Sequence, residues 1–274
     1  MTAIYNEIEP YACDWLENLI AAGHIAPGTV DRRSIKEIEP DDVRHARQFH
    51  AFAGIGVWSY ALQLAGWPTD QPVWTGSCPC QPWSHTGRHR GEKDDRHLWP
   101  AWFRLIKECR PPFVFGEQVS GQSGLDWFGS VSADLEGEGY AVAGADLPAS
   151  SVGAPHKRQR IWFFALALPD GERIRDARPA TVDRAERGRQ DQTSEGRLRP
   201  DTGERDRDVS AWDPVQWLRC SDGKARPTEP GLRPLADGAS ARVGRLRAYG
   251  NAIVPQVAAA FIRSALEVIE DLNL

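Results

Sequence analysis

The stretch from Phe52 to Trp67, "FAGIGVWSYALQLAGW", joins a glycine turn to a helix-like segment. An apolar run that begins at His50 leads into it and indicates a strand. A strand that ends in a tight glycine turn and opens a helix lets the backbone approach a ligand closely. Glycine turns are common, however, and many of them only reverse the chain. The meaning of this turn therefore depends on the segments around it.

Short apolar runs alternate with helix-like segments through residues 1–168. The helix-like segments are Tyr11–Ala22, Trp58–Ala65 and Trp99–Glu108, and the β-rich runs around them include "TAIY", "PVWTG", "FVFGEQ", "YAVAGADL" and "RIWFFALAL". This alternation predicts an α/β fold with a mostly parallel sheet flanked by helices. The last segment, "NAIVPQVAAAFIRSALEVIEDL", predicts an amphipathic helix after a glycine-asparagine turn.

The composition is that of a soluble globular protein long enough to bury a core, since 41% of its 274 residues are hydrophobic and 26% are charged. No apolar run approaches the length of a membrane span, and the N-terminal "MTAIYNEIEP" is acidic where a signal peptide would be basic. Five scattered cysteines argue against a disulfide scaffold. We therefore expect a cytoplasmic protein without a membrane partner. The net charge of −5 neither suggests nor excludes nucleic acid.

A second stretch, "TGSCPCQPWS" at Thr75–Ser84, places Cys78 and Cys80 on either side of a proline. A structural zinc site needs four ligands, and this C-x-C spacing has no matching second pair, so we expect no metal. A C-x-C redox pair is weaker still. The prolines around Cys80 hold the backbone extended, and the loop follows the strand "PVWTG". A nucleophilic cysteine there would lie beyond the carboxyl end of a strand, where open α/β sheets bind ligands.

Two further signals accompany the cysteine loop. Glu117 follows the apolar run "FVF", so its carboxylate would face the same edge of the sheet. Arg158 and Arg160 stand at alternate positions entering a strand, which directs both side chains to one face. Each signal also has a simple structural explanation, a solvated loop acid or a solvated edge strand. Their conjunction with the glycine turn favours an enzyme site.

These motifs together resemble the DNA cytosine-5 methyltransferases. "GSCPCQPWS" resembles the family's nucleophile loop, "GEQV" its glutamate-asparagine-valine motif, "HKRQR" its glutamine-arginine-arginine segment, "FAGIGVWSYALQLAGW" its S-adenosylmethionine turn and helix, and "YGNAIVPQVAAAFI" its closing helix. The resemblance covers most of residues 50–168 and 240–265. His50 departs from it where an acid is usual, Val57 where a second glycine is usual, and Cys78 where a proline is usual.

The resemblance implies a Rossmann-like, S-adenosylmethionine-dependent methyltransferase fold. It also implies a DNA (cytosine-5-)-methyltransferase that transfers a methyl group from S-adenosyl-L-methionine to C5 of a cytosine in duplex DNA. Such an enzyme flips the base out and forms a covalent bond between Cys80 and C6. Glu117 would act as a neutral acid at N3, which requires a pKa raised by burial. Arg158 and Arg160 would hold O2 and a neighbouring phosphate, and Arg158 would help to lower the thiol pKa.

The resemblance assigns further residues to the cofactor and to the substrate. The substrate-binding set is Pro79, Gln81, Ser84, Gln118 and Val119, with Gln118 in the asparagine place. The cofactor-binding set from the two matching motifs is Phe52, Ala53, Gly54, Ile55, Gly56, Asn251 and Ala252. Cys78 is expected to be a small buried residue. We expect a monomer in a bacterial or phage-infected cell, with a role in restriction-modification or phage self-protection.

Two family segments are missing between the glycine turn and the cysteine loop, because only residues 57–77 separate them. The N-terminal "AIYNEIEPYACDWLENLI" and "TVDRRSIKEI" resemble those segments, placed before the glycine turn instead. We therefore predict a permuted, phage-like or prophage-like methyltransferase. Glu7 would bind the cofactor ribose, Ile8 the adenine, and Ser34 and Ile35 would supply the contact of the third strand. Glu9 would lie within the turn, and its removal would matter little.

The permutation raises a question about the handedness of one crossover. If strand order in space is kept, the helix after the glycine turn leads to the strand on the other side. With that helix on its usual face the crossover would be left-handed, which is rare. The sequence leaves open whether the protein is such an exception or packs the helix differently.

The chain is predicted to divide into a catalytic domain, residues 1–168 plus 235–274 with the permuted strands in 1–40, and a target-recognition region at 169–234. Arginines and acids interleave from Pro169 to about Asp208 without aromatics, which is typical of a flexible loop. The alternatives are the same chemistry on RNA cytosine, transfer of a different group, or a catalytically idle DNA-binding homologue. A dinucleotide-binding oxidoreductase would explain neither the cysteine loop nor the paired arginines.

Overall fold

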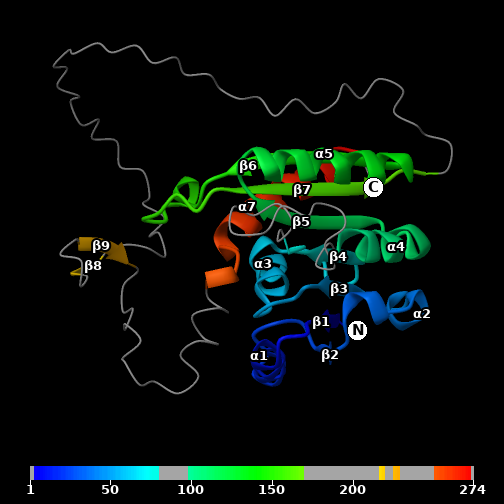
Figure 1. Ribbon diagram of the computed structural model, residues 1–274, viewed down its shortest axis with the longest axis horizontal. Coiled ribbons are helices and arrows are strands. Elements are labelled where there is room, and N and C mark those ends of the chain that lie inside the picture. The colour runs from blue at the N-terminus through cyan, green and yellow to red at the C-terminus, as the bar shows by residue number, and fades with distance from the viewer. Residues whose placement is uncertain (1–2, 80–97, 170–215, 220–224, 229–249, 273–274) are drawn as a thin grey trace, which may run out of the picture.

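A computed structural model describes residues 3–79, 98–169, 216–219, 225–228 and 250–272. Its centre is a seven-stranded sheet with helices on both faces (Figure 1). The strands are β1 (Ala3–Asn6), β2 (Gly28–Asp31), β3 (Gln48–Ala51), β4 (Val73–Gly76), β5 (Phe113–Val119), β6 (Tyr140–Leu147) and β7 (Arg160–Ala167), with β8 (Gln216–Arg219) and β9 (Ala225–Thr228) in a separate two-stranded sheet. The helices are α1 (Pro10–Ala21), α2 (Pro40–Val43), α3 (Val57–Ala65), α4 (Trp99–Cys109), α5 (Gln122–Gly137) and α7 (Pro255–Asp271), with the 3₁₀ turns η1 (Ile35–Glu37) and η4 (Ala149–Val152).

The strands lie in the order β2-β1-β3-β4-β5-β7-β6. Strands β1 to β5 are mutually parallel, and β7 runs antiparallel to both of its neighbours. The prediction of an α/β fold with a mostly parallel sheet is confirmed. The carboxyl ends of β1, β3, β4 and β5 consequently share one edge, which is where open α/β sheets bind ligands. β1 and β2, which come first in the chain, lie beyond β3 on the side away from β4.

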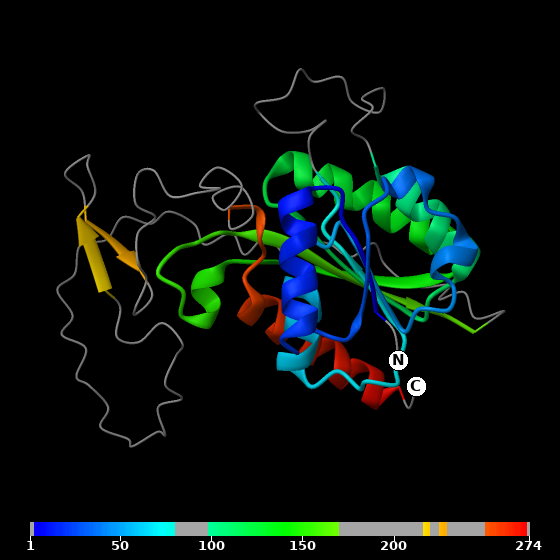
Figure 2. The same ribbon diagram turned by 90° about the horizontal axis from the view of Figure 1, so that it is seen from below.

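Helices α1, α3 and α7 cover one face of the sheet (Figure 2). The Tyr5 hydroxyl of β1 donates to the Ala26 carbonyl after α1, at 2.6 Å, and bonds the Ser59 hydroxyl of α3, at 3.0 Å. Arg263 of α7 donates to the Leu64 carbonyl of α3, at 3.2 Å. These contacts tie the three helices to one another on that face.

Helices α2, α4 and α5 cover the opposite face (Figure 2). Arg104 of α4 donates to the Ile38 carbonyl just before α2, at 2.6 Å. The Trp99 indole of α4 donates to Asp134 of α5, at 2.7 Å. Trp102 of α4 is fully buried beneath them. The sheet is therefore covered on both sides, as a parallel sheet requires.

The crossover from β3 through α3 to β4 is left-handed. The β1–α1–β2 crossover moves outward over the α1/α3/α7 face, and β3–α3–β4 moves in the opposite direction over the same face. The β2–α2–β3 and β4–α4–β5 crossovers follow the direction of β3–α3–β4, but over the other face. The β1–α1–β2, β2–α2–β3 and β4–α4–β5 crossovers therefore have the same hand, the usual right-handed one. Of these four crossovers, only β3–α3–β4 has the rare left-handed form. The handedness that the sequence left open is thereby decided.

Glycines set both ends of α3. Gly56, with φ 80°, precedes the helix, and Gly66, with φ 78°, ends it, so both occupy the left-handed region that side chains rarely adopt. A Cβ at Gly56 would come within 3.0 Å of the Leu16 side chain and 3.1 Å of Ile25. The glycine is therefore needed for its backbone angle and for the close packing of α1 against the turn.

His50 is fully buried in β3 beneath the glycine turn. Its ring stacks on Tyr5 with centroids 4.8 Å apart, and Nδ1 lies 2.7 Å from the Thr75 hydroxyl of β4. Burial lowers the pKa of His50 to about 3. His50, which stands where the family usually has an acid, is thus a neutral ring that joins β1, β3 and β4.

Candidate active site

A pocket of about 180 Å³ opens at the carboxyl edge of the sheet. It lies where Glu7 follows β1, the glycine turn follows β3, and Ser77 follows β4. The segment before α7 closes it with Asn251–Ile253. The predicted residues that line this pocket are Glu7, Phe52, Ala53, Gly54, Ile55, Pro79, Asn251 and Ala252.

The Glu7 carboxylate joins the end of β1 to the glycine turn. Its Oε2 accepts from the Gly54 amide at 2.8 Å, and its Oε1 accepts from the Ile8 and Glu9 amides, each at 2.9 Å. A carboxylate can accept about four hydrogen bonds, so three amides leave capacity for a ligand hydroxyl. The sequence order of strand, acid and helix thus places a half-buried carboxylate at the pocket wall.

The turn itself leaves room for a ligand. Gly54 has φ 56°, and a Cβ there would meet no protein atom within 4 Å. Ile8 lies outside the pocket lining and is 61% exposed, which is unusual for an isoleucine. Gly56 likewise lies outside this pocket, packed against Leu16 and Ile25.

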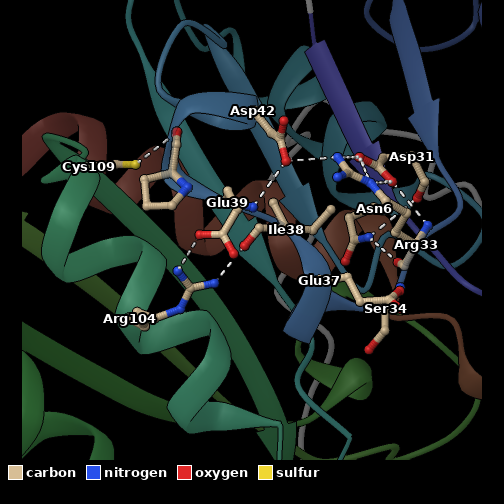
Figure 3. A network of polar contacts seen from close by, with 11 residues as sticks. Asn6, Asp31, Arg33, Ser34, Glu37, Ile38, Glu39, Asp42, Arg104 and Cys109 are labelled. Atoms are coloured by element: carbon tan, nitrogen blue, oxygen red, sulfur yellow. Dashed lines mark hydrogen bonds and ion pairs between the residues drawn. The ribbon is translucent and has the colours of Figure 1, made fainter.

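Ser34 and Ile35 differ from the expectation that they contact the cofactor. Ile35 is 2% exposed and belongs to the core, while Ser34 caps η1 together with Glu37. The loop after β2 is closed by its own polar contacts: Arg33 pairs with Asp31 at 2.6 Å and with Asp42 at 2.9 Å, and Asn6 donates to the Arg33 carbonyl at 2.8 Å (Figure 3). Neither Ser34 nor Ile35 lines the pocket.

Glu117 is a buried acid at the end of β5. It is 8% exposed, and its Oε1 lies 2.7 Å from Nε of Arg160, which begins β7. Burial raises the pKa of Glu117, although Arg160, a hydrogen bond from Ser77 and the charge of Arg158 all act to lower it. The direction follows from the loss of water around the carboxylate, which outweighs its cationic neighbours. The site therefore holds a carboxyl group that takes up a proton more readily than an exposed one.

Arg158 is held by the segment that precedes α7. Its Nη2 donates to the Gly250 carbonyl at 2.8 Å and to the Ala252 carbonyl at 2.6 Å. Its backbone has φ 30° and it precedes β7, so strand alternation does not place its side chain on the same face as that of Arg160. Burial lowers the pKa of Arg158. One nitrogen of this guanidinium is therefore engaged with protein carbonyls.

The base of the cysteine loop is anchored to β5. The Gln118 amide donates to the Cys78 carbonyl at 3.2 Å, and Gln118 Oε1 accepts from the Val119 amide at 2.9 Å. Cys78 is 3% exposed and packs in the core, as expected for a small buried residue. Pro79, the last described residue before Cys80, is exposed. The predicted residues Cys80, Gln81 and Ser84 lie outside the described residues.

Six residues of the pocket lining were not among the predicted site residues, and three of them, Glu9, Trp58 and Ser77, make hydrogen bonds at the wall. Glu9 caps α1 by accepting from the Ala12 amide at 2.8 Å and also lines the pocket, which argues against the expectation that its removal matters little. Trp58 and Ser77 bond each other across the wall. Trp58 stands in the first turn of the helix after the glycine turn, and Ser77 lies between a strand and the cysteine loop. These two positions, next to predicted motifs, were the sequence features that could have indicated a place in the pocket wall.

Within the described ranges, no group of three or more His, Cys, Asp or Glu side chains is arranged to hold a metal ion. In that same part of the chain, no helix has the length and apolar character needed to cross a membrane. What the carboxyl edge does offer is a carboxylate beside an open glycine turn and a buried acid paired with Arg160. This combination suits a group-transfer enzyme that binds a hydroxyl-bearing cofactor and protonates its substrate.

Comparison with known proteins agrees with this kind of site. Residues 66–195 match the C-5 cytosine-specific DNA methylases. The chain is 33% identical over 119 residues to type II methyltransferase M.AgeI of Thalassovita gelatinovora, covering 42% of this chain and 27% of that protein. It is 33% identical over 129 residues to type II methyltransferase M.AluI of Cellulosimicrobium cellulans, covering 43% of this chain and 24% of that protein.

Residues 66–195 are thus similar to the C-5 cytosine-specific DNA methylase family, and the resemblance read from the motifs is confirmed. The chain spans about a quarter of the length of the two relatives. Among solved structures, the methyltransferase EhMeth of Entamoeba histolytica is similar with a TM-score of 0.41 and 16% identity, covering 62% of this chain and 46% of that one.

Proposed function

We propose that this protein transfers a methyl group from S-adenosylmethionine to C5 of a cytosine in duplex DNA. The observation that carries the proposal is the Glu117–Arg160 pair, a buried acid with a raised pKa, beside a pocket formed by Glu7 and the glycine turn. The cysteine loop leaves the sheet at the same edge. The family match supports the reaction class.

The pocket fits the cofactor at two points. The Glu7 carboxylate, already aligned by three backbone amides, has lone-pair capacity left for one hydroxyl of a ribose. Gly54 leaves open space where a side chain would otherwise fill the pocket. The exposed Ile8 offers an apolar surface for an adenine ring. When bound, S-adenosylmethionine supplies an electrophilic methyl group on a sulfonium.

Residues that follow β4, end β5 and precede or begin β7 would activate the cytosine. The base must leave the stacked duplex, at a cost of a few kcal/mol, because C6 is hidden within it. The Cys80 thiolate adds to C6 while Glu117 gives its proton to N3, which leaves an enamine with an electron-rich C5. After C5 has gained the methyl group, loss of its proton expels the thiolate, and the proton on N3 returns to Glu117.

The arginines divide their work in this proposal. Arg160 pairs with the Glu117 carboxylate as it forms and reaches O2 of the base with its remaining donors. Arg158, which donates to Gly250 and Ala252, fixes the Asn251 turn against the cofactor pocket and keeps its other nitrogens for a phosphate.

We also propose that the motif order is permuted. The support is the sheet order, in which β1 and β2 precede the glycine turn in the chain and lie on its far side in space, with Glu7 at the end of β1. Residues 169–234 would form the target-recognition region, and most of them lie outside the described residues. The names of the relatives favour a role as a restriction-modification methyltransferase.

The test is expression in a bacterial host without cytosine-5 methylation, followed by sequencing of methylcytosine in its DNA. The wild type should methylate a defined sequence, Cys80→Ser should be inactive, and Cys78→Ser, the matched control, should retain most activity. Duplex DNA with 5-fluorocytosine should trap the wild type covalently, because fluorine cannot leave as a proton does. Methylation of RNA alone, or equal loss in both cysteine variants, would refute the proposal.

A further inference from the structure

Glu9 is a second carboxylate in the pocket at the end of β1. It lines the pocket together with Glu7, and both side chains are half-buried. The Glu9 backbone amide donates to Glu7 Oε1 at 2.9 Å, so the first acid holds the main chain of the second. Among the described residues that line this pocket there is no lysine, arginine or histidine to pair with either acid. Two neighbouring carboxylates therefore share one ligand-sized space.

The two carboxylates differ in how many hydrogen bonds they can still accept. A carboxylate has about four acceptor positions, two on each oxygen. Glu7 uses three of them for backbone amides. Glu9 uses one, because its Oε2 accepts from the Ala12 amide at 2.8 Å, and from the described part of the chain its Oε1 accepts no hydrogen bond. Glu9 therefore retains more capacity for a ligand than Glu7 does.

Capping of α1 does not by itself explain a glutamate at this position. The residues that cap helices best are serine, threonine, aspartate and asparagine, whose short side chains reach the amides of the first turn. Glu9 makes its cap with one oxygen. A serine would supply the same bond and nothing more. What the glutamate adds is a second carboxylate oxygen at the pocket wall.

We propose that Glu9 is a cofactor-binding residue, which accepts a hydrogen bond from one ribose hydroxyl of S-adenosylmethionine while Glu7 accepts from the other. This inference rests on the proposed function, in which the pocket holds that cofactor. A ribose presents two adjacent hydroxyls, and Glu7 has capacity left for one. A hydroxyl that is taken out of water without an acceptor is costly, and Glu9 supplies the acceptor that the second one needs.

This arrangement makes the pocket specific for a ribonucleoside. A site built to hydrogen-bond a hydroxyl rejects an analogue that lacks it, because the polar groups of the site are then left unpaired. With a separate carboxylate for each hydroxyl, the loss of either hydroxyl weakens binding independently of the other. Analogues that lack one hydroxyl therefore probe the two carboxylates one at a time.

The test measures binding of S-adenosylhomocysteine and of its 2′-deoxy and 3′-deoxy forms to the full chain by calorimetry, without DNA or turnover. The wild type should bind each deoxy form about 10- to 100-fold more weakly than the parent compound. Glu9→Ser, which keeps a capping hydroxyl, should bind one deoxy form as well as it binds the parent and still discriminate against the other. Glu7→Ala should show the opposite pattern, and Glu136→Ser, at an exposed position on α5, should discriminate as the wild type does.

The melting temperature separates binding from capping. Glu9→Ser should melt close to the wild type, whereas Glu9→Ala should melt at a lower temperature because α1 loses its cap. Undiminished discrimination against both deoxy forms in Glu9→Ser would overturn this inference and leave the proposed function intact. A wild type that binds neither S-adenosylhomocysteine nor S-adenosylmethionine would overturn both.

Discussion

The two halves of the carboxyl edge satisfy their acids in different ways. In the first half, at the ends of β1 and β3, Glu7 accepts from three backbone amides. In the second half, at the end of β5 and the start of β7, Glu117 pairs with a charged side chain, Arg160. Backbone donors are fixed by the fold, whereas side-chain partners can be shared with a substrate. The first half is therefore suited to holding a ligand and the second to moving a proton.

The largest expected effect concerns whether the first half is integral to the fold. β1 lies between β2 and β3, so a chain that begins at His45 would lose two strands and expose the edge of β3. We expect that chain to show no cooperative thermal transition. If it folds and binds S-adenosylmethionine with normal affinity, the N-terminal strands are dispensable and the permuted interpretation is wrong.

The next effect separates chemistry from binding. Glu117→Gln removes the proton that N3 would receive, and we expect methyl transfer to fall by about 10²- to 10⁴-fold. Binding of S-adenosylmethionine, measured by calorimetry, should change little, because Glu117 does not line the pocket. The matched control is Glu136→Gln, an exposed position on α5. Equal loss of binding and of rate would contradict the division of the edge into two halves.

A smaller effect is expected at Glu7. Charge-assisted hydrogen bonds to ribose hydroxyls are worth about 1.5–3 kcal/mol, so Glu7→Ala should weaken cofactor binding by about one to two orders of magnitude. The variant should also lower the melting temperature, since three amides lose their acceptor. Glu9→Ala is unsuitable as a neutral control, because Glu9 caps α1. Glu136→Ala serves instead, and a Glu7→Ala variant with normal affinity would remove Glu7 from the site.

The smallest effect is a dependence of stability on pH. The pKa of His50 is lowered to about 3 from its ordinary 6.5, so its contribution to stability is present above pH 6.5 and is lost as pH falls toward 3. At pH 4.5 the wild type should have lost about 2 kcal/mol more unfolding free energy than His50→Gln, whose amide can still bond Thr75. Urea unfolding at pH 7 and pH 4.5 measures this. Parallel losses in both proteins would show that His50 does not titrate with folding.

The parts of the site that the sequence predicts are those encoded by local chemistry. Gly54 and Gly56 indicate a tight turn because glycine readily adopts positive φ angles. The order of strand, acid and helix predicts the position of Glu7 at the edge of the sheet. Glu117 is predicted because it directly follows an apolar strand. In each case the deciding residues are neighbours in the chain.

What the sequence could not predict depends on distant partners. Arg158 reaches carbonyls more than 90 positions away, and no local pattern indicates that use of its guanidinium. Ser34 and Ile35 were placed by analogy, but a polar network around Arg33 decides their loop. Helix α5 was not predicted from the sequence either. Its buried residues pack against the sheet and belong to no recognisable motif. The fold class could be predicted from the sequence. Whether a given side chain faces a ligand or the core could be predicted less well.

The left-handed β3–α3–β4 crossover also bears on the order in which the protein assembles. As the chain leaves the ribosome, this unit has no local preference for its final hand, since an isolated unit of this kind favours the right-handed form. Its helix is secured instead by Tyr5 and Ser59 and by Arg263 of α7, which lies 199 positions beyond Leu64. Contacts of such long range form slowly and late. The glycine turn would therefore reach its final position only after synthesis of α7, and a nascent chain would carry Cys80 before the pocket was complete.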